Sequence, residues 1–302
     1  MDNTGLTVVV CCNKKDFFLA KICIASIRYF YPEIPIELVK DFGNGYFSSK
    51  KLEQVYKVKN IDLGIKKIGW GAAKFHYLFH MPLGKKVFLL DADIIFLGPF
   101  LNRMERLSKE NDYVVSAEKH VDPYSEYSKI TYFDTREVER KFSDYKFPGY
   151  FFNTGQVFVT VGSIEKDEIA KYFDQSTFPY WKDQSLFPLV DQSVYNYLLP
   201  TLSSQGKLKL ATDNFVIWSR SNIANDINLE SITSKSCDVG VLHWAGDIRT
   251  PFLKQMNRSD ILEFFEDNYY RSIPFGRAKQ FITKIIPVSE YYMRLFYHKI
   301  KN

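Results

Sequence analysis

Two aspartates inside an apolar run are the first sign of chemistry in this chain. Asp91 and Asp93 lie within residues 87–97, with four apolar residues before the pair and four after it. This pattern is typical of a buried strand of a parallel sheet, where a carboxylate is costly unless it is paired, hydrogen-bonded or bound to a metal. Alternate residues of a strand point to the same side, so both carboxylates are expected to face one cation. Mg²⁺ and Mn²⁺ suit such oxygen ligands together with substrate phosphates. The pattern predicts a divalent-metal site for a phosphorylated ligand, and the other interpretation is a pair of turn-forming or helix-capping acids.

Composition bounds the class of protein. The 302 residues are 46% hydrophobic, with 26 Phe and 20 Tyr, which is enough for one large or two small domains. The sequence contains no run of 18 uncharged apolar residues, so we expect no transmembrane helix. Residues 1–4 lack a basic segment followed by an apolar one, so we expect no secretory signal. The cysteines show neither zinc nor Cys-x-x-Cys spacing, so we expect free thiols and a reducing, cytoplasmic compartment. They are Cys11, Cys12, Cys23 and Cys237.

The net charge of +5 is concentrated at one end of the chain. Residues 275–302 hold six Lys or Arg against Glu290 alone, so this segment accounts for the whole excess. A nucleic-acid-binding protein more usually carries a basic face within its fold. We therefore expect no nucleic-acid partner.

The order of expected elements predicts the fold class. Apolar runs indicate strands at 7–12, 36–39, 113–117, 207–210 and 239–243. A further strand at 150–159 is interrupted by a turn at 153–155. Helices are expected at 17–31, 50–59, 72–81, 164–174, 190–199 and 259–270. This alternation indicates an α/β domain with a largely parallel, Rossmann-like sheet. Residues 120–147 show no clear period and are expected to form an inserted loop or lid.

Five local features occur in an order that resembles the nucleotide-sugar glycosyltransferases of the GT-A fold. The resemblance is greatest to family 8, which includes bacterial lipopolysaccharide galactosyltransferases and glycogenin. It spans roughly residues 7–252, and it is carried by the ordered set, because each motif alone is common. The features are Lys74, Leu90-Asp-Ala-Asp-Ile94, Phe152-Asn-Thr-Gly155, Asp191-Gln192 and His243-Trp-Ala-Gly-Asp-Ile-Arg-Thr-Pro251.

The resemblance implies a metal centre. Asp91, Asp93 and His243 would hold Mn²⁺ or Mg²⁺ against the diphosphate of the donor, because the cation offsets repulsion between carboxylates and phosphate. An isolated histidine would be read as a core or surface residue. Here Gly246 and Pro251 follow at the family's spacing, which favours the ligand role.

The resemblance also implies which residues contact the donor. Lys74 and Arg249 would approach the phosphates, with Gly246 beside them. The family usually carries Lys where Arg249 stands, and Arg can grip a phosphate with two hydrogen bonds. Lys74 taken alone would be an ordinary solvated lysine.

Two further motifs would contact the donor sugar. Asn153 and Gly155 match a sugar-contacting turn, although Asn-x-Gly is also a plain turn signal. Asp191 would contact sugar hydroxyls, and Gln192 would lie beneath the anomeric carbon and assist a retaining displacement. Asp191 at a helix start is also a good N-cap. An amide is a poor nucleophile, so attack by the acceptor on the donor's own face is the alternative.

The segment expected to bind the nucleotide base matches the family less well. Family members follow the first strand with an acid-rich segment, whereas this chain has Cys-Cys-Asn-Lys-Lys-Asp at 11–16. Asn13 or Asp16 could hydrogen-bond the base. UDP and other nucleotides therefore both stay open.

The C-terminal segment predicts a basic amphipathic helical tail. Apolar residues near helical spacing are interspersed with six cations, and Pro287 would kink or divide the helix. Such a tail either lies on an anionic membrane or packs on the domain with a solvated charged face. We divide the chain into a GT-A domain at 1–258 and this tail at 259–302. The apolar positions are Phe281, Ile285, Val288, Tyr292 and Leu295.

These observations together predict a cytoplasmic, metal-dependent hexosyltransferase, peripheral on the membrane if the tail binds lipid. It would move a hexose from a UDP-sugar to a glycan or glycolipid acceptor, as in surface polysaccharide or lipopolysaccharide assembly. Residues 120–147 and 178–183 are candidates for the acceptor side. Two alternatives stay open: a sugar-nucleotide nucleotidyltransferase, and a non-catalytic carbohydrate-binding protein on the same scaffold. Cys11–Asp16 lacks the glycines expected of a nucleotidyltransferase phosphate loop.

Overall fold

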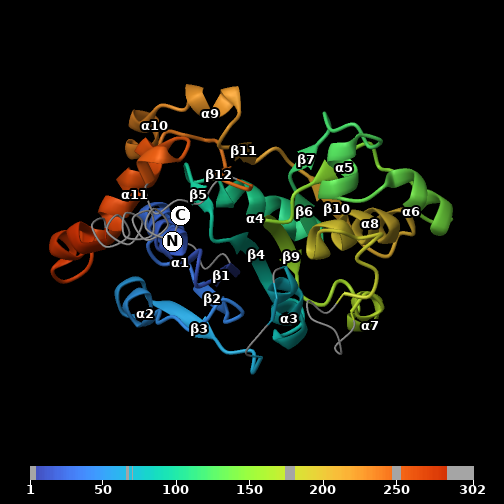
Figure 1. The fold of residues 1–302 in the computed structure, drawn as a ribbon, viewed down its shortest axis with the longest axis horizontal. Helices are drawn as coiled ribbons and strands as arrows, with labels where there is room; N and C mark the ends of the chain where they lie inside the picture. Colours follow the sequence, from blue (N-terminus) through green and yellow to red (C-terminus); the bar gives the residue numbers. More distant parts are fainter. Residues whose placement is uncertain (1–4, 66–67, 70, 174–180, 247–252, 284–302) are drawn as a thin grey trace, which may run out of the picture.

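The computed structural model describes residues 5–65, 68–69, 71–173, 181–246 and 253–283. A seven-stranded sheet forms the centre of the molecule, in the order β10-β6-β9-β4-β1-β2-β3 (Figure 1). Only β9 runs antiparallel, against both β4 and β6. The strands are β1 (Leu6–Asn13), β2 (Ile36–Asp41), β3 (Val58–Ile61), β4 (Lys86–Asp91), β6 (Tyr113–Val115), β9 (Gln156–Thr160) and β10 (Leu210–Thr212). The predicted α/β class with a mostly parallel sheet is confirmed.

Two small sheets flank the central one and reach toward its carboxyl edge. One joins β11, β12 and β5, and the other pairs β7 with β8. In the first, β12 runs antiparallel to β5. Their bounds are β5 (Ile94–Phe96), β7 (Ala117–Glu118), β8 (Phe151–Phe152), β11 (Val216–Trp218) and β12 (Val241–His243).

Helices cover both faces of the central sheet. On β4, Phe88 and Leu90 enter one buried apolar cluster, whereas Val87 and Leu89 enter the other. A strand buried on both faces has no polar side, which is why this run reads as continuously apolar. The helices are α1 (Phe17–Phe30), α2 (Lys50–Tyr56), α3 (Ala72–His80), α4 (Leu101–Glu110), α5 (Glu126–Thr131), α6 (Thr135–Lys141), α7 (Lys166–Ala170), α8 (Val190–Ser204), α9 (Asn222–Asp226), α10 (Leu229–Thr233), the 3-10 turn η1 (Leu253–Gln255) and α11 (Ser259–Arg271).

The structure corrects the expected strand at 87–97. β4 ends at Asp91, which pairs with Cys11 of β1, and residues 94–96 leave to form β5 in another sheet. Asp93 therefore lies in the turn between two strands rather than inside one. The two carboxylates come together because the chain turns here, and the strand-alternation argument for their shared side was wrong.

Other boundaries also differ from the predictions. The helix expected at 50–59 ends at Tyr56, because Lys57 adopts a left-handed conformation and β3 follows at once. The strand expected at 207–210 begins only at Leu210. The segment 120–147 is not a structureless loop, since it contains α5 and α6.

The C-terminal part of the described chain packs on the domain. α11 lies along α1 (Figure 1), and Ile261, Leu262 and Phe265 are fully buried there. The predicted boundary after residue 258 stays a prediction. The last part of the predicted tail, 284–302, lies outside the described residues. Within the described ranges, no helix combines the length and hydropathy that crossing a membrane requires.

Candidate metal centre and cavity

A cavity of about 850 Å³ opens where the small sheets meet the end of β4. Ligands of open α/β sheets bind at the carboxyl ends of the strands, and pockets for small molecules commonly have this volume. Its lining brings together most of the candidate residues. They are Lys74, Asp91, Asp93, Asn153, Gly155, Asp191, Gln192, His243 and Gly246.

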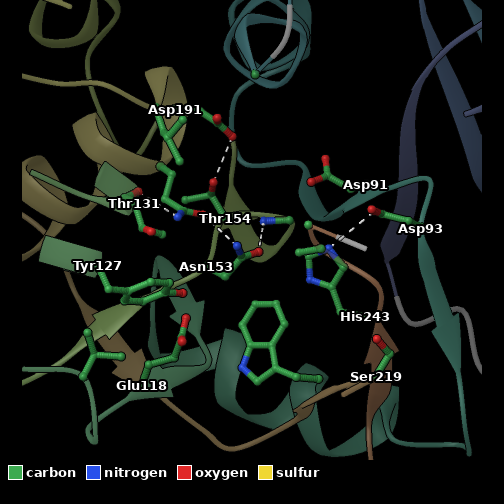
Figure 2. A pocket seen from close by; sticks show the side chains of 18 of the residues that line it. Asp91, Asp93, Glu118, Tyr127, Thr131, Asn153, Thr154, Asp191, Ser219 and His243 are labelled. Atoms are coloured by element: carbon green, nitrogen blue, oxygen red, sulfur yellow. Dashed lines mark hydrogen bonds and ion pairs between the residues drawn. The ribbon is translucent and has the colours of Figure 1, made fainter. Parts of the chain in front are cut away.

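Asp91, Asp93 and His243 converge at one end of the cavity (Figure 2). His243 is the last residue of β12 and pairs with Ile94 of β5, directly after Asp93. The His243 Nε2 atom lies 3.4 Å from an Asp93 carboxylate oxygen. One ligand atom from each of the three residues lies within 4.8 Å of the others. The antiparallel β5–β12 pairing thus joins segments about 150 residues apart.

The chemistry of this group fits a divalent cation. Two carboxylates and one imidazole offer hard and borderline ligands, as Mn²⁺ or Mg²⁺ would take. Burial raises the pKa of Asp91 above its usual value, Lys74 lowers it, and the neighbouring Asp93 and Asp191 raise it further. The cluster therefore holds excess negative charge, which a cation would relieve. The Asp91 side chain remains 37% exposed toward solvent, so the centre is open to a ligand.

Gly155 makes this convergence possible. The Asp91 amide donates to the Gly155 carbonyl at 2.7 Å, tying the end of β4 to the turn before β9. A Cβ atom on Gly155 would lie 2.5 Å from His243 Cε1 and 2.7 Å from Asn153 Oδ1. Only glycine leaves room for the turn, the histidine and the carboxylate together.

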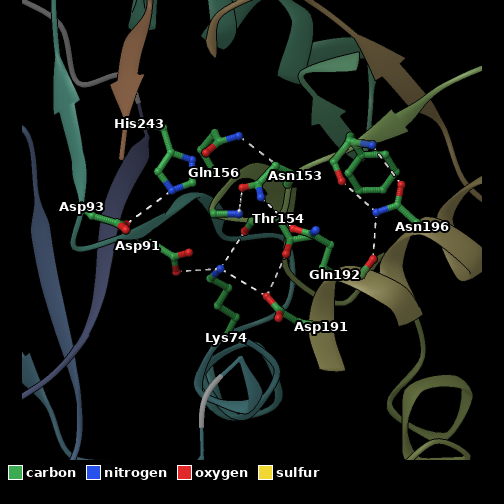
Figure 3. Close-up of polar contacts among 12 residues, drawn as sticks. Lys74, Asp91, Asp93, Asn153, Thr154, Gln156, Asp191, Gln192, Asn196 and His243 are labelled. Atoms are coloured by element: carbon green, nitrogen blue, oxygen red, sulfur yellow. Dashed lines mark hydrogen bonds and ion pairs between the residues drawn. The ribbon is translucent and has the colours of Figure 1, made fainter. Parts of the chain in front are cut away.

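Lys74 is buried, and its ammonium group is surrounded by acceptors (Figure 3). It lies 2.8 Å from Asp91 Oδ1 and 3.2 Å from Asp191 Oδ2, and it donates to the Thr154 carbonyl at 2.7 Å. Burial alone would lower the pKa of Lys74, but Asp91 and Asp191 outweigh it and raise that pKa. The lysine therefore stays charged and connects the candidate metal centre with the start of α8.

A second polar group lies beside the metal centre. Asn153 accepts the Gly155 amide at 2.7 Å and donates its own amide to Gln192 Oε1 at 2.7 Å. Gln192 in turn donates to the Thr131 carbonyl at 3.0 Å. Both ends of each amide are thereby oriented. The Thr154 hydroxyl donates a hydrogen bond to Asp191 Oδ2 at 2.9 Å.

The start of α8 is strained where it enters the cavity. Val190 has φ of 30°, which is unfavourable for a β-branched residue, and it precedes Asp191 and Gln192. Gly71 packs directly against this turn, and a Cβ atom there would collide with Asp191. Backbone strain is characteristic of sites where side chains are held for function.

Asn13 and Asp16, two further candidates, do not line the main cavity. Asn13 donates to Asp16 at 2.7 Å and accepts the Lys15 amide at 2.7 Å, so both ends of its side chain serve its own turn. Asn13 and Asp16 line a small adjoining cavity that shares Asp91 and Lys74 with the main one. Arg249 lies outside the described residues.

Sequence reasoning did not single out Glu118, Trp218 and Arg220, which line the cavity. Tyr127, which also lines it, lies in the segment 120–147 that was expected on the acceptor side. Glu118 is 7% exposed and accepts the Tyr132 hydroxyl at 2.9 Å. Burial raises the pKa of Glu118, an effect that Tyr132 and the nearby histidines reduce. No motif marks these positions, and an acid directly after the apolar run 113–117 was the one available signal for Glu118.

Comparisons with known proteins find similarity in structure alone. No protein-family model matches the chain, and no curated protein matches it in sequence. The chain is similar to the bifunctional glycosyltransferase WbbM, with a TM-score of 0.58 and 12% identity, over 89% of this chain and 50% of that one. It is similar to the galactosyltransferase LgtC, with a TM-score of 0.53 and 15% identity, over 87% of this chain and 95% of that one.

The glycosyltransferase GlyE of Streptococcus pneumoniae is also similar, with a TM-score of 0.51 and 13% identity, over 95% of this chain and 63% of that one. The chain thus spans about half of WbbM and nearly all of LgtC. At these identities the likeness shows the fold. The chain has the mixed α/β, GT-A architecture of these glycosyltransferases.

Proposed function

We propose that this chain is a metal-dependent, family 8-like glycosyltransferase that moves a hexose from a UDP-sugar to a glycan or glycolipid acceptor. The observation that carries the proposal is the convergence of Asp91, Asp93 and His243 at the open end of a large cavity. The LgtC structure contains donor and acceptor sugar analogues, which supports the same use of the cavity here. A second LgtC structure carries an active-site glutamine-to-glutamate change, which supports a role for Gln192.

The metal would be held by Asp91, Asp93 and His243, and would neutralise the donor diphosphate. This chain's own residues would orient the hexose. Asp191 accepts hydrogen bonds from sugar hydroxyls, and the Asn153–Gln192 pair presents a fixed amide surface beneath the ring. Preorganised dipoles of this kind stabilise developing charge without reorganising.

The proposed transfer retains the anomeric configuration. Because the Gln192 amide oxygen already accepts from Asn153 and is a poor nucleophile, we propose that the acceptor oxygen attacks on the face from which the diphosphate leaves. The new bond joins that oxygen to the anomeric carbon, the bond to the diphosphate breaks, and the acceptor proton passes to the departing phosphate oxygen. No residue changes its protonation state overall.

We also propose a cytoplasmic location, with 275–302 contacting anionic lipid during assembly of a surface polysaccharide. The net charge of this segment supports the contact. The acceptor would then be presented at the membrane surface.

The test is a screen for nucleotide release from UDP-, GDP- and CDP-sugars, with and without Mn²⁺. We expect UDP release that requires the metal, and Asp93→Ala should lower it by at least about 100-fold, because a ligand and its charge are lost. Gly43→Ala, in an exposed turn, is the control and should leave release unchanged. In a separate reaction with UTP and hexose 1-phosphate, pyrophosphate release would indicate a nucleotidyltransferase instead. Sugar binding without release in either reaction would indicate a non-catalytic protein.

A further inference from the structure

Glu118 is a buried carboxylate in the cavity that the metal and donor groups do not use. It ends β7, and within the described residues its side chain accepts a hydrogen bond from the neutral Tyr132 hydroxyl. Within the described ranges, no lysine or arginine forms an ion pair with it. Holding a carboxylate this way is costly, because most of its hydration is lost on burial and a single neutral hydroxyl donates to it. A second hydroxyl donor from a ligand would satisfy the remaining oxygen.

Two aromatic rings line the same cavity. Tyr127 on α5 is 56% exposed, although it stands at the cavity wall. The half-buried Trp218 ring lies nearly parallel to His243, with 5.2 Å between centroids and 24° between planes. Exposed aromatic faces beside a hydrogen-bond acceptor are what a sugar ring needs, because its C–H face is apolar and its edge carries hydroxyl donors.

We call the part of the cavity lined by Glu118, Tyr127 and Trp218 the Glu118 arm. This arm adjoins the candidate metal centre. Figure 2 shows Glu118 and Tyr127 across the cavity from Asp91 and Asp93. The stacked Trp218 joins the arm to His243. Tyr127 lies on α5, which ends at Thr131. The Thr131 carbonyl accepts a hydrogen bond from the Gln192 amide. A ring in the arm would therefore lie next to the groups assigned to the donor sugar.

The charges of the arm favour an uncharged ligand. Glu118 is buried, so its charge acts in a medium of low dielectric constant and repels another anion strongly. His120, Asp122 and Arg220 also line the cavity, but they are exposed on its rim, where solvent screens them. A sugar bearing a carboxylate or phosphate would bring a second negative charge to the buried one.

We propose that Glu118, Tyr127 and Trp218 form the acceptor subsite and hold a neutral hexopyranose, with a ring hydroxyl donating to Glu118. The inference deepens the proposed glycosyl transfer by assigning the class of acceptor. It also stands as a binding statement that requires no turnover.

Binding is measured by saturation-transfer NMR with methyl β-galactopyranoside, methyl α-glucopyranoside and a methyl glucuronide, on the full chain without donor. We expect the wild type to bind at least one neutral glycoside and the glucuronide more weakly. Glu118→Gln should weaken binding of the neutral glycoside roughly 10-fold, which is the usual effect of losing a hydrogen bond to a charged group. The same variant should narrow the difference between neutral and acidic sugars. The matched control is Glu126→Gln, which removes an exposed acid of α5 outside the cavity lining and should change nothing.

A second variant keeps the test independent of folding. Tyr127 is more than half exposed, so Tyr127→Ala leaves the core intact and should also weaken the glycoside. Absence of binding by every neutral glycoside, or equal binding by the wild type and Glu118→Gln, would overturn the subsite. Failure of the proposed function appears separately, as absence of UDP release in wild type whose sugar binding still depends on Glu118.

Discussion

At the scale of single residues, Lys74 links two functions through one buried charge. Its ammonium group offsets Asp91, a proposed metal ligand, and Asp191, a proposed sugar ligand. A buried ion pair is costly to form, yet removing one partner leaves an uncompensated charge that is costlier still. The lysine therefore positions both carboxylates and also competes with a cation for Asp91.

Lys74→Met should lower the free energy of unfolding by about 3–5 kcal/mol, because two buried carboxylates lose their partner. Addition of Mn²⁺ should then raise the melting temperature more in the variant than in the wild type, since the cation supplies the missing positive charge. Thermal unfolding with and without Mn²⁺ measures both effects. Lys129→Met, which breaks only ion pairs screened by solvent, should leave the melting temperature nearly unchanged. An equal Mn²⁺ response in both variants would contradict the linkage.

The effect of Glu118 on the stability of the folded protein depends on pH. Because its pKa is raised in the folded chain, the folded state binds this proton more tightly than the unfolded state does. Stability from this group is present below the unfolded value of 4.5 and is lost as pH rises through the folded pKa. The ionised carboxylate thus destabilises the protein at pH 8.

Glu118→Gln should therefore melt at a higher temperature than the wild type at pH 8, and the difference should shrink as pH falls below the folded pKa. Melting is followed in EDTA from pH 8 to pH 4. His120 and His243 also face Glu118, so the variant and the wild type are compared at every pH. Glu126→Gln, at an exposed acid, should show no such trend. A pH-independent difference between Glu118→Gln and the wild type would contradict the burial argument.

At the scale of elements, Asn196 holds α8 against β8, the strand beside the candidate metal centre. Asn196 accepts the Phe152 amide at 2.9 Å and donates to the Phe152 carbonyl at 2.8 Å, as a neighbouring strand would. It donates also to the Gln192 carbonyl at 2.8 Å (Figure 3). This contact sets where α8 presents Gln192 to Asn153.

Asn196→Ala should lower the free energy of unfolding by about 1–3 kcal/mol for each of the two buried Phe152 backbone groups that loses its partner. It should also lower donor turnover, because Gln192 loses its alignment with Asn153. Chemical denaturation and UDP release measure the two effects. Gln205→Ala, at the exposed end of the same helix, should alter neither. Normal turnover in a destabilised Asn196→Ala would show that the contact serves stability alone.

At the scale of the whole molecule, α11 completes the core on the α1 side of the sheet. Ile261, Leu262 and Phe265 are fully buried and together contribute roughly 5–9 kcal/mol. That sum is comparable with the whole stability of a typical domain, about 5–15 kcal/mol. α11, the first helix of the predicted tail, is thus built into the domain's core.

A chain ending at residue 258 should therefore fail to fold, whereas one ending at 283 should melt within a few degrees of the full chain. Circular dichroism on heating distinguishes them. A cooperative, wild-type-like transition in the 1–258 chain would support the predicted domain boundary instead.

The 1–283 chain also tests the proposed lipid contact. The full chain should sediment with anionic vesicles at low salt, and the shorter chain should not, because four of the six terminal cations are lost. Equal sedimentation would remove the membrane proposal.

The sequence by itself determined most strands of the central sheet and its longer helices α1, α3, α8 and α11, because a strand buried on both faces must be apolar throughout and a helix must repeat every 3.6 residues. It did not predict β3 or α4. The runs at 7–12 and 36–39 could be read without any partner. The candidate residues beyond Asp91 and Asp93 came from resemblance, since no local pattern marks His243 as a metal ligand.

Only the tertiary structure decided how those residues meet. β4 ends at Asp91 and β5 pairs with β12, which carries His243 to Asp93, and pairing between distant strands leaves no local signature. Glu118 reached the cavity wall in the same way, through the short β7–β8 pairing. Periodicity records which side of an element is buried, whereas the neighbour against which it is buried depends on the path of the whole chain.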